Sequence, residues 1–429
     1  MRILYLAAGI PVPGSLGGST HAYEVARGLA QRGHELHLVA ASHEGWGGLA
    51  PFARPVSSSL DGFHLHHQDV PKALSLLGAA PILRLARALR PDAIIERYYN
   101  FAGVGLIAAR QLGVPALLEV NALIVDPPSV RKRRIDDALG GPMRRWATWQ
   151  CNTADRIVTP LHTTVPATIP RHKIIELPWG ANVDRFLPRF GDKETRRQGD
   201  KETRRQGDKE TRRQPDATVR HSLSPGLPVS LSPNVVFMGS FRAWHGVTDF
   251  VRAALLLLEQ GHALRFTLIG DGPERAAAEA LAAPRAASFR FTGAVPYERV
   301  PALLAEAELG VAPFNTAPHP ALRAAGFFWS PLKIYEYMAA GLPVVTANIP
   351  PLSTVIRDGI EGALFPEGDV HALAAAIARV LAEPAAAHAM GQRARERVVA
   401  YYSWQRHCAE LERILLELVP ATHLRRMID

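Results

Sequence analysis

Short apolar runs with β character alternate with amphipathic helical segments through the first part of the chain. ILYLA at residues 3–7 precedes a helical stretch at residues 21–32, and the runs ELHLVA, AIIER and PALLEV follow. Alternation of strand and helix predicts a parallel sheet with helices on both faces. The opening MRILYLAAGIPVPG is interpreted as a buried strand of this sheet rather than a targeting signal, because its apolar run breaks at proline and glycine.

The same alternation resumes after residue 233, where the runs NVVFMG, RFTLIG, FRFTG, LGVAPF and PVVTA are separated by helical segments such as residues 247–260. We therefore predict two doubly wound α/β domains, over residues 1–188 and 233–400. In folds of this kind the site lies in the cleft outside the carboxyl ends of the strands.

Between the two parts, GDKETRRQ occurs three times without change, at residues 191–198, 199–206 and 207–214. It holds no residue suited to a core, so we predict that residues 189–232 form a mobile, charged insertion and linker, with a solvated helix as the alternative. Each repeat carries a net charge of +1, and the three supply three of the nine excess positive charges of the chain. The rest of the protein is less basic, and nucleic acid is not expected as a partner.

Composition narrows the class of protein. The two cysteines, Cys151 and Cys408, exclude a disulfide framework and suit a reducing, cytoplasmic compartment. No apolar stretch approaches the roughly 18 residues that a membrane-spanning helix needs, so no span is expected. His64, His66 and His67 lie on an alternating stretch typical of a surface strand, and no metal site is predicted there.

Glycine-bearing turns lead from strands into helices at several points. Gly17 and Gly18 precede the first helix, where free backbone N–H groups favour an anion, although the turn is not the G-x-G-x-x-G dinucleotide fingerprint. In the second part, Arg242 and His245 lie in a similar turn and could both donate to a phosphate. Gly272 lies in a later turn of the kind that encloses a base or sugar. Each turn alone is also compatible with a structural role.

The segment SPLKIYEYMAAGLPVV, residues 330–345, predicts a helix capped by Ser330 and ended by Gly341. Lys333 and Glu336 are three residues apart and therefore neighbours on one face. Lys333 is one of only seven lysines in the chain. A compact cation near a helix N-terminus indicates a phosphate site, with Glu336 accepting from ribose hydroxyls beside it. A surface ion pair is the alternative, and the spacing does not decide between the two.

Six blocks of the sequence, in order, resemble glycosyltransferase family 4. The members of this family are nucleotide-sugar transferases of the two-domain GT-B architecture that retain the configuration of the sugar. The six blocks are GGSTHAYEVARGLAQRGHELHLVA, ADRIVTPLHTTV, KIIELPWGANVDRFLP, FTLIGDGPER, FRFTGAVPYERVPALLAEAELGVAPF and KIYEYMAAGLPVVTANIPPLSTVIRDGIEGALF. The resemblance extends over nearly the whole chain apart from residues 191–232. The tail MGQRARERVVAYYSW resembles the last helices of the family, which implies that residues 401–429 return to the first domain.

The resemblance implies that the second domain holds a UDP- or GDP-activated sugar and that the first domain binds the acceptor. It implies that Glu336 contacts the ribose and that the backbone of Val295 touches the base. The full donor-binding set that it implies is Gly17, Gly18, Gly272, Val295, Phe328, Ser330, Leu332 and Glu336. The usual phosphate-binding Arg and Lys fall on Ser240 and His245. Arg242 and Lys333 are therefore expected to supply the missing charge.

Two further positions depart from the family pattern. Phe328 stands where the first glutamate of the Glu-x7-Glu motif contacts the donor sugar, and Asn121 stands where a histidine is common. Asparagine cannot transfer a proton at pH 7, but it can hydrogen-bond a sugar hydroxyl. The residues expected to carry the chemistry are Arg242, His245, Lys333 and Asn121. Such chemistry depends on positioning and electrostatic stabilisation, and no metal or other cofactor is expected.

Basic residues are interleaved with tryptophans in the first domain, at residues 131–134 and 144–149. This pattern suits peripheral contact with an anionic membrane, and a solvated helix with two core tryptophans is the alternative. The resulting hypothesis is a cytoplasmic retaining glycosyltransferase, peripheral at the inner face of the membrane, that acts on polysaccharide or glycolipid precursors of the cell envelope. A sugar-nucleotide epimerase of the same architecture and a catalytically silent sugar-nucleotide-binding protein are the alternative functions.

Overall fold

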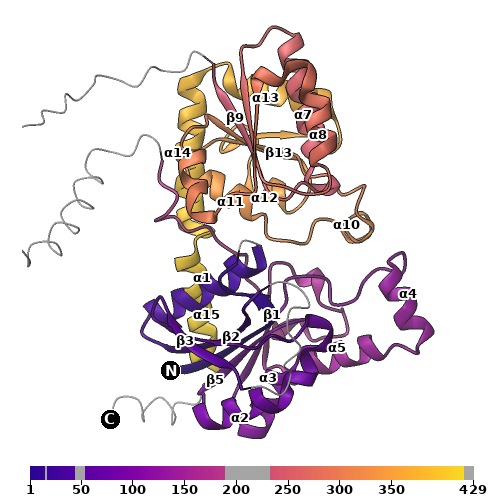
Figure 1. Ribbon diagram of the computed structural model, residues 1–429, viewed down its shortest axis with the longest axis vertical. Coiled ribbons are helices and arrows are strands. Elements are labelled where there is room, and N and C mark those ends of the chain that lie inside the picture. Colours follow the sequence, from indigo (N-terminus) through magenta and orange to yellow (C-terminus); the bar gives the residue numbers. More distant parts are fainter. Residues whose placement is uncertain (15–16, 44–53, 189–231, 420–429) are drawn as a thin grey trace, which may run out of the picture.

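Two α/β domains follow one another along the long axis of the molecule (Figure 1). The computed structural model describes residues 1–14, 17–43, 54–188 and 232–419. The GDKETRRQ repeats, predicted to form a mobile insertion, lie outside these residues.

The first domain is built on an eight-stranded sheet with the order β3-β4-β2-β1-β5-β6-β7-β8, parallel except for the β3–β4 pair. Its strands are β1 (Arg2–Pro11), β2 (Glu35–Ala41), β3 (Val56–Leu60), β4 (Phe63–His67), β5 (Ala93–Arg97), β6 (Ala116–Glu119), β7 (Arg156–Thr159) and β8 (Ile174–Glu176). Its helices are α1 (Gly17–Gln31), α2 (Ala79–Leu89), α3 (Val104–Leu112), α4 (Arg131–Ala138) and α5 (Pro142–Thr153). All five residues of β5 are buried, as expected for a strand with helices on both faces.

The second domain has a six-stranded parallel sheet with the order β11-β10-β9-β12-β13-β14. The strands are β9 (Asn234–Met238), β10 (Arg265–Ile269), β11 (Phe289–Gly293), β12 (Leu309–Ala312), β13 (Val344–Ala347) and β14 (Gly362–Phe365). The helices are α7 (Val247–Glu259), α8 (Arg275–Ala282), α9 (Val300–Leu304), α10 (Pro320–Ala325), α11 (Leu332–Ala339), α12 (Leu352–Val355) and α13 (Val370–Leu381). Two parallel-sheet α/β domains are thus confirmed.

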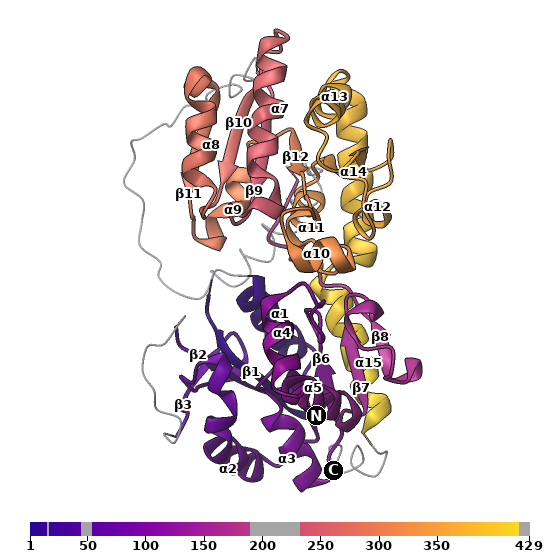
Figure 2. The same cartoon turned by 90° about the vertical axis from the view of Figure 1, so that its right-hand side faces the viewer.

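The last two helices connect the domains. Helix α14 (Pro384–Tyr401) lies beside the second domain, and α15 (Trp404–Leu418) lies along the first (Figures 1 and 2). The junction is fixed at Ala181, whose backbone N–H donates to Tyr402 and whose carbonyl accepts from Trp404. In α15, Leu411 and Leu415 are buried in the same core as Val25 and Leu29 of α1.

Membrane-spanning potential is confined to one bent pair of helices in the part of the chain that the structure describes. None of its single helices is long and apolar enough to cross a bilayer. Helices α13 and α14 together would pass by length and composition, but they bend by 99° at their junction.

Candidate active site

A cavity of about 860 Å³ lies between the two domains. Gly18 and Asn121 line it from the first domain, and Phe328 lines it from the second. Aromatic rings of Tyr99 and Trp329 also face it, which suits a sugar because a ring can pack on the apolar face of a pyranose. Three of the predicted site residues, far apart in sequence, therefore share one cavity.

Asn121 is held by Trp179 at the wall of this cavity. The indole N–H of Trp179 donates to Asn121 Oδ1 at 2.7 Å. The Nδ2 group of Asn121 has no hydrogen-bond partner among the described residues. A buried amide with one open donor can bind an oxygen of a ligand. The hydroxyl-binding role of Asn121 stays a prediction.

The predicted capping role of Ser330 is wrong. Helix α11 begins at Leu332, with Pro331 at the N-cap position and no side-chain capping bond. The hydroxyl of Ser330 instead accepts from the backbone N–H of Trp179 at 3.0 Å. That contact joins the second domain to Trp179 of the first, so Ser330 links the domains instead of capping the helix.

Lys333 carries a buried basic side chain in the first turn of α11. Its side chain is 7% exposed, and its Nζ has no hydrogen-bond partner among the described residues. The ammonium lies 4.4 Å from the ring centre of Phe237 and 4.9 Å from that of Phe314. Burial lowers the pKa of Lys333 to about 7, because the charged form has lost its water. The surface ion pair with Glu336 is wrong, since both side chains are buried and no ion pair joins them in the described structure.

Glu336, one turn further along α11, is 6% exposed. The hydroxyl of Tyr297 donates to its Oε1 at 2.8 Å, and within the described chain no residue bonds to Oε2. Burial raises the pKa of Glu336 to about 7. Val295 is half-buried and packs, like Tyr297, against the hydrophobic core that contains the buried apolar residues of α11. A carboxylate with one open oxygen beside a backbone turn can accept from the hydroxyls of a ribose.

His245, at the position of the usual phosphate-binding lysine, is buried. Its Nδ1–H donates to the backbone carbonyl of Ser240, and its side chain is 8% exposed. Burial and then the charge of Lys333 lower the pKa of His245 to about 2, so the ring is neutral at pH 7. Arg242 lies on the same turn with an exposed side chain. With a pKa of about 7, Lys333 is therefore the more basic of the two buried side chains.

The two other glycines of the predicted set, Gly17 and Gly272, have different neighbours. A methyl group at Gly17 would lie 3.3 Å from Leu332 Cδ1, and Leu332 packs against core residues of both domains. Gly272 has a φ of +154°, and a methyl group there would lie 2.8 Å from the backbone of Phe241. Gly272 does not line the cavity, so its visible role is to let two turns approach each other.

A buried polar group beneath the cavity was missed by the sequence reasoning. Arg97, which lines the cavity, donates to His21 Nδ1 at 2.9 Å. His21 Nε2 lies 2.6 Å from Glu119 Oε1, and the hydroxyl of Tyr5 donates to Glu119 Oε2 at 2.5 Å. Burial alone would raise the pKa of Glu119, but His21 and Arg97 hold it below its usual range. The available signal was a charged residue at the end of two apolar runs, AIIER and PALLE.

The histidine-rich strand differs in part from its prediction. His64 is exposed, but His66 is only 5% exposed, and its two ring nitrogens lie within hydrogen-bond distance of His37 and Ser57. Donor atoms of Glu35, His37 and His64 lie within 4.8 Å of one another. Arg2 pairs with Glu35 at 2.9 Å, and the rings of His37 and His64 stack with 4.6 Å between their centres.

Comparisons with known proteins agree with this arrangement. Residues 16–178 match the family "Glycosyltransferase Family 4", and residues 232–383 match "Glycosyl transferases group 1". The alpha-D-kanosaminyltransferase of Streptomyces kanamyceticus is 28% identical over 173 residues, which are 40% of this chain and 42% of that protein. The first curated relatives are thus matched over only about two fifths of their length.

Two further likenesses extend over nearly the whole chain. The D-inositol 3-phosphate glycosyltransferase of Salinispora tropica is 25% identical over 98% of this chain and 84% of its own length. The structure of Anabaena Alr3699/HepE in complex with UDP superposes with a TM-score of 0.66 and 16% identity over 97% of this chain and 100% of that one, which shows the shared fold. With both domains matched in order, the chain belongs to the GT-B glycosyltransferases, and it joins a family 4 domain to a group 1 domain.

Proposed function

We propose that this protein transfers a sugar from a UDP- or GDP-linked donor to a glycan or lipid-linked acceptor, with retention of configuration at the sugar. The observation that carries the proposal is Lys333, whose buried Nζ has no hydrogen-bond partner among the described residues and which lies at the start of α11. A buried basic group without a hydrogen-bond partner costs stability and is a candidate for contact with a ligand. The crystallised relative from Anabaena binds UDP, which supports a nucleoside diphosphate as that ligand.

In this proposal the donor lies along α11. Lys333 and the N-terminus of the helix hold the diphosphate, and Glu336 accepts from the ribose through its open oxygen. The backbone of Val295 borders the base. Arg242, exposed on the neighbouring turn, closes over the phosphates from the solvent side.

The proposed chemistry depends on stabilising the leaving diphosphate. As the bond to the sugar breaks, negative charge grows on the diphosphate oxygen, and Lys333 and the helix dipole stabilise that charge. The same oxygen can take the proton of the acceptor hydroxyl, which then attacks from the same face and retains the configuration. Asn121 positions a hydroxyl with its open Nδ2 donor. We propose that no metal or other cofactor takes part, because Lys333 supplies the cationic charge.

The acceptor would enter from the first domain. Tyr99, Trp179 and Asn121 line that side of the cavity, a mixture of rings and polar atoms typical of carbohydrate sites. Both cysteines are buried and free, which agrees with a cytoplasmic location. We propose a role at the inner face of the membrane, on precursors of cell-envelope polysaccharide or glycolipid.

The experiment starts with titration calorimetry of UDP, GDP and ADP, followed by assays of nucleotide release from the sugar conjugates of the nucleotide that binds. Release that requires an acceptor, with an α-linked product from an α-linked donor, is the expected result. Release from the donor alone, without an acceptor, would favour an epimerase. Tight nucleotide binding without release for any acceptor would favour the silent binding protein, for which Phe328 and the neutral His245 are the structural arguments.

A further inference from the structure

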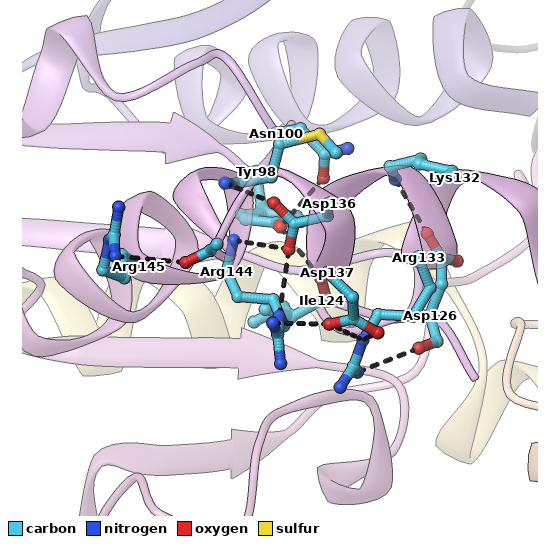
Figure 3. A network of polar contacts seen from close by, with 12 residues as sticks. Tyr98, Asn100, Ile124, Asp126, Lys132, Arg133, Asp136, Asp137, Arg144 and Arg145 are labelled. Carbon is cyan, nitrogen blue, oxygen red and sulfur yellow. Dashed lines mark hydrogen bonds and ion pairs between the residues drawn. The ribbon is translucent and has the colours of Figure 1, made fainter. Parts of the chain in front are cut away.

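One cluster of polar side chains in the first domain, on α4 and α5, is complete in itself (Figure 3). Arg144 Nε lies 3.0 Å from Asp136 Oδ2, and the backbone N–H of Met143 donates to the other oxygen of Asp136 at 2.8 Å. Asp137 pairs with both Arg133 and Arg144. Both carboxylates of α4 therefore have cationic partners, and this cluster needs no ligand to complete it.

The tryptophans beside this cluster do not form the surface predicted from the sequence. The indole N–H of Trp146 donates to the carbonyl of Ala102 at 2.8 Å, and its ring stacks on Trp149 with 4.4 Å between centres. A methyl group at Gly103 would lie 3.2 Å from the ring of Trp146 and 3.4 Å from that of Trp149. Both tryptophans therefore pack inward against the start of α3.

A second cluster, at the amino ends of β2 and β4, contains donor atoms for a metal ion. Glu35 is the first residue of β2, His37 follows on the same face of that strand, and His64 lies opposite His37 on β4. One donor atom of each residue lies within 4.8 Å of the other two. A carboxylate and two imidazoles are a donor set of zinc sites that have three protein ligands. We call these three residues the β2–β4 triad.

The hairpin of β3 and β4 sets the position of His64. Its two-residue turn, Asp61-Gly62, has φ angles of 44° and 87°, and two positive φ angles are typical of the tight turns that join such strands. In the resulting register, His64 lies between Ser59 of β3 and His37 of β2. His37 is 5% exposed and His64 is exposed, so the triad has one buried anchor and one ring that can rotate.

The donor atoms lie near the spacing that a tetrahedral ion needs. His37 Nε2 is 3.1 Å from Glu35 Oε1, and the rings of His37 and His64 are stacked with 4.6 Å between their centres. Zn²⁺ binds such donors at about 2.0–2.1 Å, which places neighbouring donors roughly 3.4 Å apart in a tetrahedron. A small rotation of the exposed His64 ring is therefore enough to complete the site.

Two ligands of the triad have outer partners of the kind that surround metal sites. His37 Nδ1 is 3.0 Å from His66 Nε2, and His66 Nδ1 is 2.8 Å from Ser57 Oγ. With Nε2 of His37 on a metal, its Nδ1–H donates to His66, and the Nδ1–H of His66 donates to Ser57. Arg2 Nε lies 2.9 Å from Glu35 Oε1, and that oxygen has a second lone pair for an ion. These contacts orient the triad toward a ligand.

The triad is not the group of histidines that the sequence brought to notice. His64, His66 and His67 are close together in one strand, but His67 Nε2 lies 2.9 Å from the carbonyl oxygen of Val12. His66 is the outer partner of His37. Of the three, only His64 belongs to the triad, and its fellow ligands come from a strand that the fold places beside it.

We propose that the β2–β4 triad binds a Zn²⁺ ion, with a water molecule in the fourth position. Glu35 also lines a second cavity, of about 800 Å³, which gives the ion a path from the solvent. Ala41, at the other end of β2, lines the active-site cavity, so the length of the strand, roughly 20 Å, separates the two sites. The ion would tie β2 to the β3–β4 hairpin and takes no part in the proposed sugar transfer. Either proposal can therefore fail without the other.

The test is titration calorimetry of the untagged full-length protein with ZnCl₂ near pH 7, after EDTA treatment and removal of the EDTA. The wild type should form a one-to-one complex, and Co²⁺ in its place should give the visible absorption of a tetrahedral ion. His64→Asn and Glu35→Gln each remove one ligand at an exposed position, and each should weaken Zn²⁺ binding by roughly tenfold or more. His262→Asn is the matched control, because His262 is an exposed histidine of the second domain, and it should bind Zn²⁺ like the wild type.

The outer partner has its own test. His66→Leu should weaken Zn²⁺ binding by about tenfold to a hundredfold, the range for a lost outer contact. His66→Gln should keep most of the affinity, because its amide oxygen can accept from His37 Nδ1. Zn²⁺ should also raise the midpoint of thermal unfolding of the wild type but not of His64→Asn, since an ion that binds the folded state stabilises it.

Equal Zn²⁺ affinity in the wild type, His64→Asn and Glu35→Gln would overturn the proposal. So would an equal loss in His64→Asn and His262→Asn, which would mean that scattered surface histidines bind the ion. Equal circular dichroism spectra and unfolding midpoints of His64→Asn and the wild type in EDTA show that a lost site is not a lost fold. UDP affinity in EDTA should be the same for these two proteins, which separates the triad from donor binding.

Discussion

Lys333 points its ammonium at Gly239: a methyl group on Gly239 would lie 2.8 Å from Lys333 Nζ. The two residues come from different elements, since Gly239 follows strand β9 and Lys333 lies in the first turn of helix α11. The bare backbone of Gly239 thus makes the space in which the ammonium stands. If the proposed function holds, the diphosphate of the donor meets its cation in this space.

Gly239→Ala should destabilise the protein and weaken nucleotide binding. Gly239 has a φ of +139°, where a side chain is strained by about 1–3 kcal/mol, and the added methyl group would also crowd Lys333. Gly261→Ala is the control, because Gly261 has a φ of +88° with open space around it. The thermal midpoint should fall further for Gly239→Ala than for Gly261→Ala. Equal losses would mean that Lys333 moves aside without cost.

Lys333→Met should stabilise the free protein near pH 7, because it removes a buried charge and keeps a flexible apolar chain. Burial lowers the pKa of Lys333 from 10.5 to about 7. Between those pH values the unfolded chain holds a proton that the folded protein has released, so the free energy of unfolding of the wild type rises with pH. The rise is at most about 1.4 kcal/mol per pH unit.

The measurement for this prediction is the free energy of unfolding of both proteins at several pH values from 7 to 10. The advantage of Lys333→Met should be largest at pH 7 and should shrink as the pH rises. An advantage that stays constant over this range would show that Lys333 keeps an ordinary pKa in the folded protein.

The strands were predictable because a parallel sheet covered on both faces requires short, continuous apolar runs, and AIIER corresponds to β5 residue for residue. The start of α11 was not predictable in this way, because the hydroxyl of Ser330 bonds to Trp179, 151 residues away in the sequence. A local pattern cannot show that a distant backbone N–H competes for a capping side chain.

The same limit applies to the site. Lys333 and Glu336 could be picked out by their spacing, but their burial depends on how the second domain packs around α11. Arg97 was overlooked because a charged residue at the end of a strand is ordinary in sequence. Its partner Glu119 lies at the end of the neighbouring strand, and only the pairing of β5 with β6 brings the two together.

Phe328 should set the selectivity for the donor sugar. It is 2% exposed and lines the cavity beside Trp329, with 4.7 Å between ring centres. An aromatic wall cannot accept from a hydroxyl, and an apolar pocket rejects an added hydroxyl only weakly. The wild type should therefore discriminate little between a sugar and its deoxy analogue, and Phe328→Glu should shift the preference toward the hydroxylated donor.

The check is kcat/KM for matched donor pairs in the wild type and in Phe328→Glu. A wild-type preference of a thousandfold or more for the hydroxylated sugar, on the order expected of a hydrogen-bonded site, would show that another residue makes this contact.

The central claim is that α11 binds the nucleoside diphosphate of a sugar donor. Titration calorimetry with UDP and GDP measures this binding. The wild type, Lys333→Met and Glu336→Gln are compared at one pH and salt concentration. Each variant should lose about 1.5–3 kcal/mol of binding free energy for the cognate nucleotide, the range for hydrogen bonds to charged groups, while its fold is unchanged by circular dichroism. Wild-type affinity in both variants would contradict the proposed role of α11.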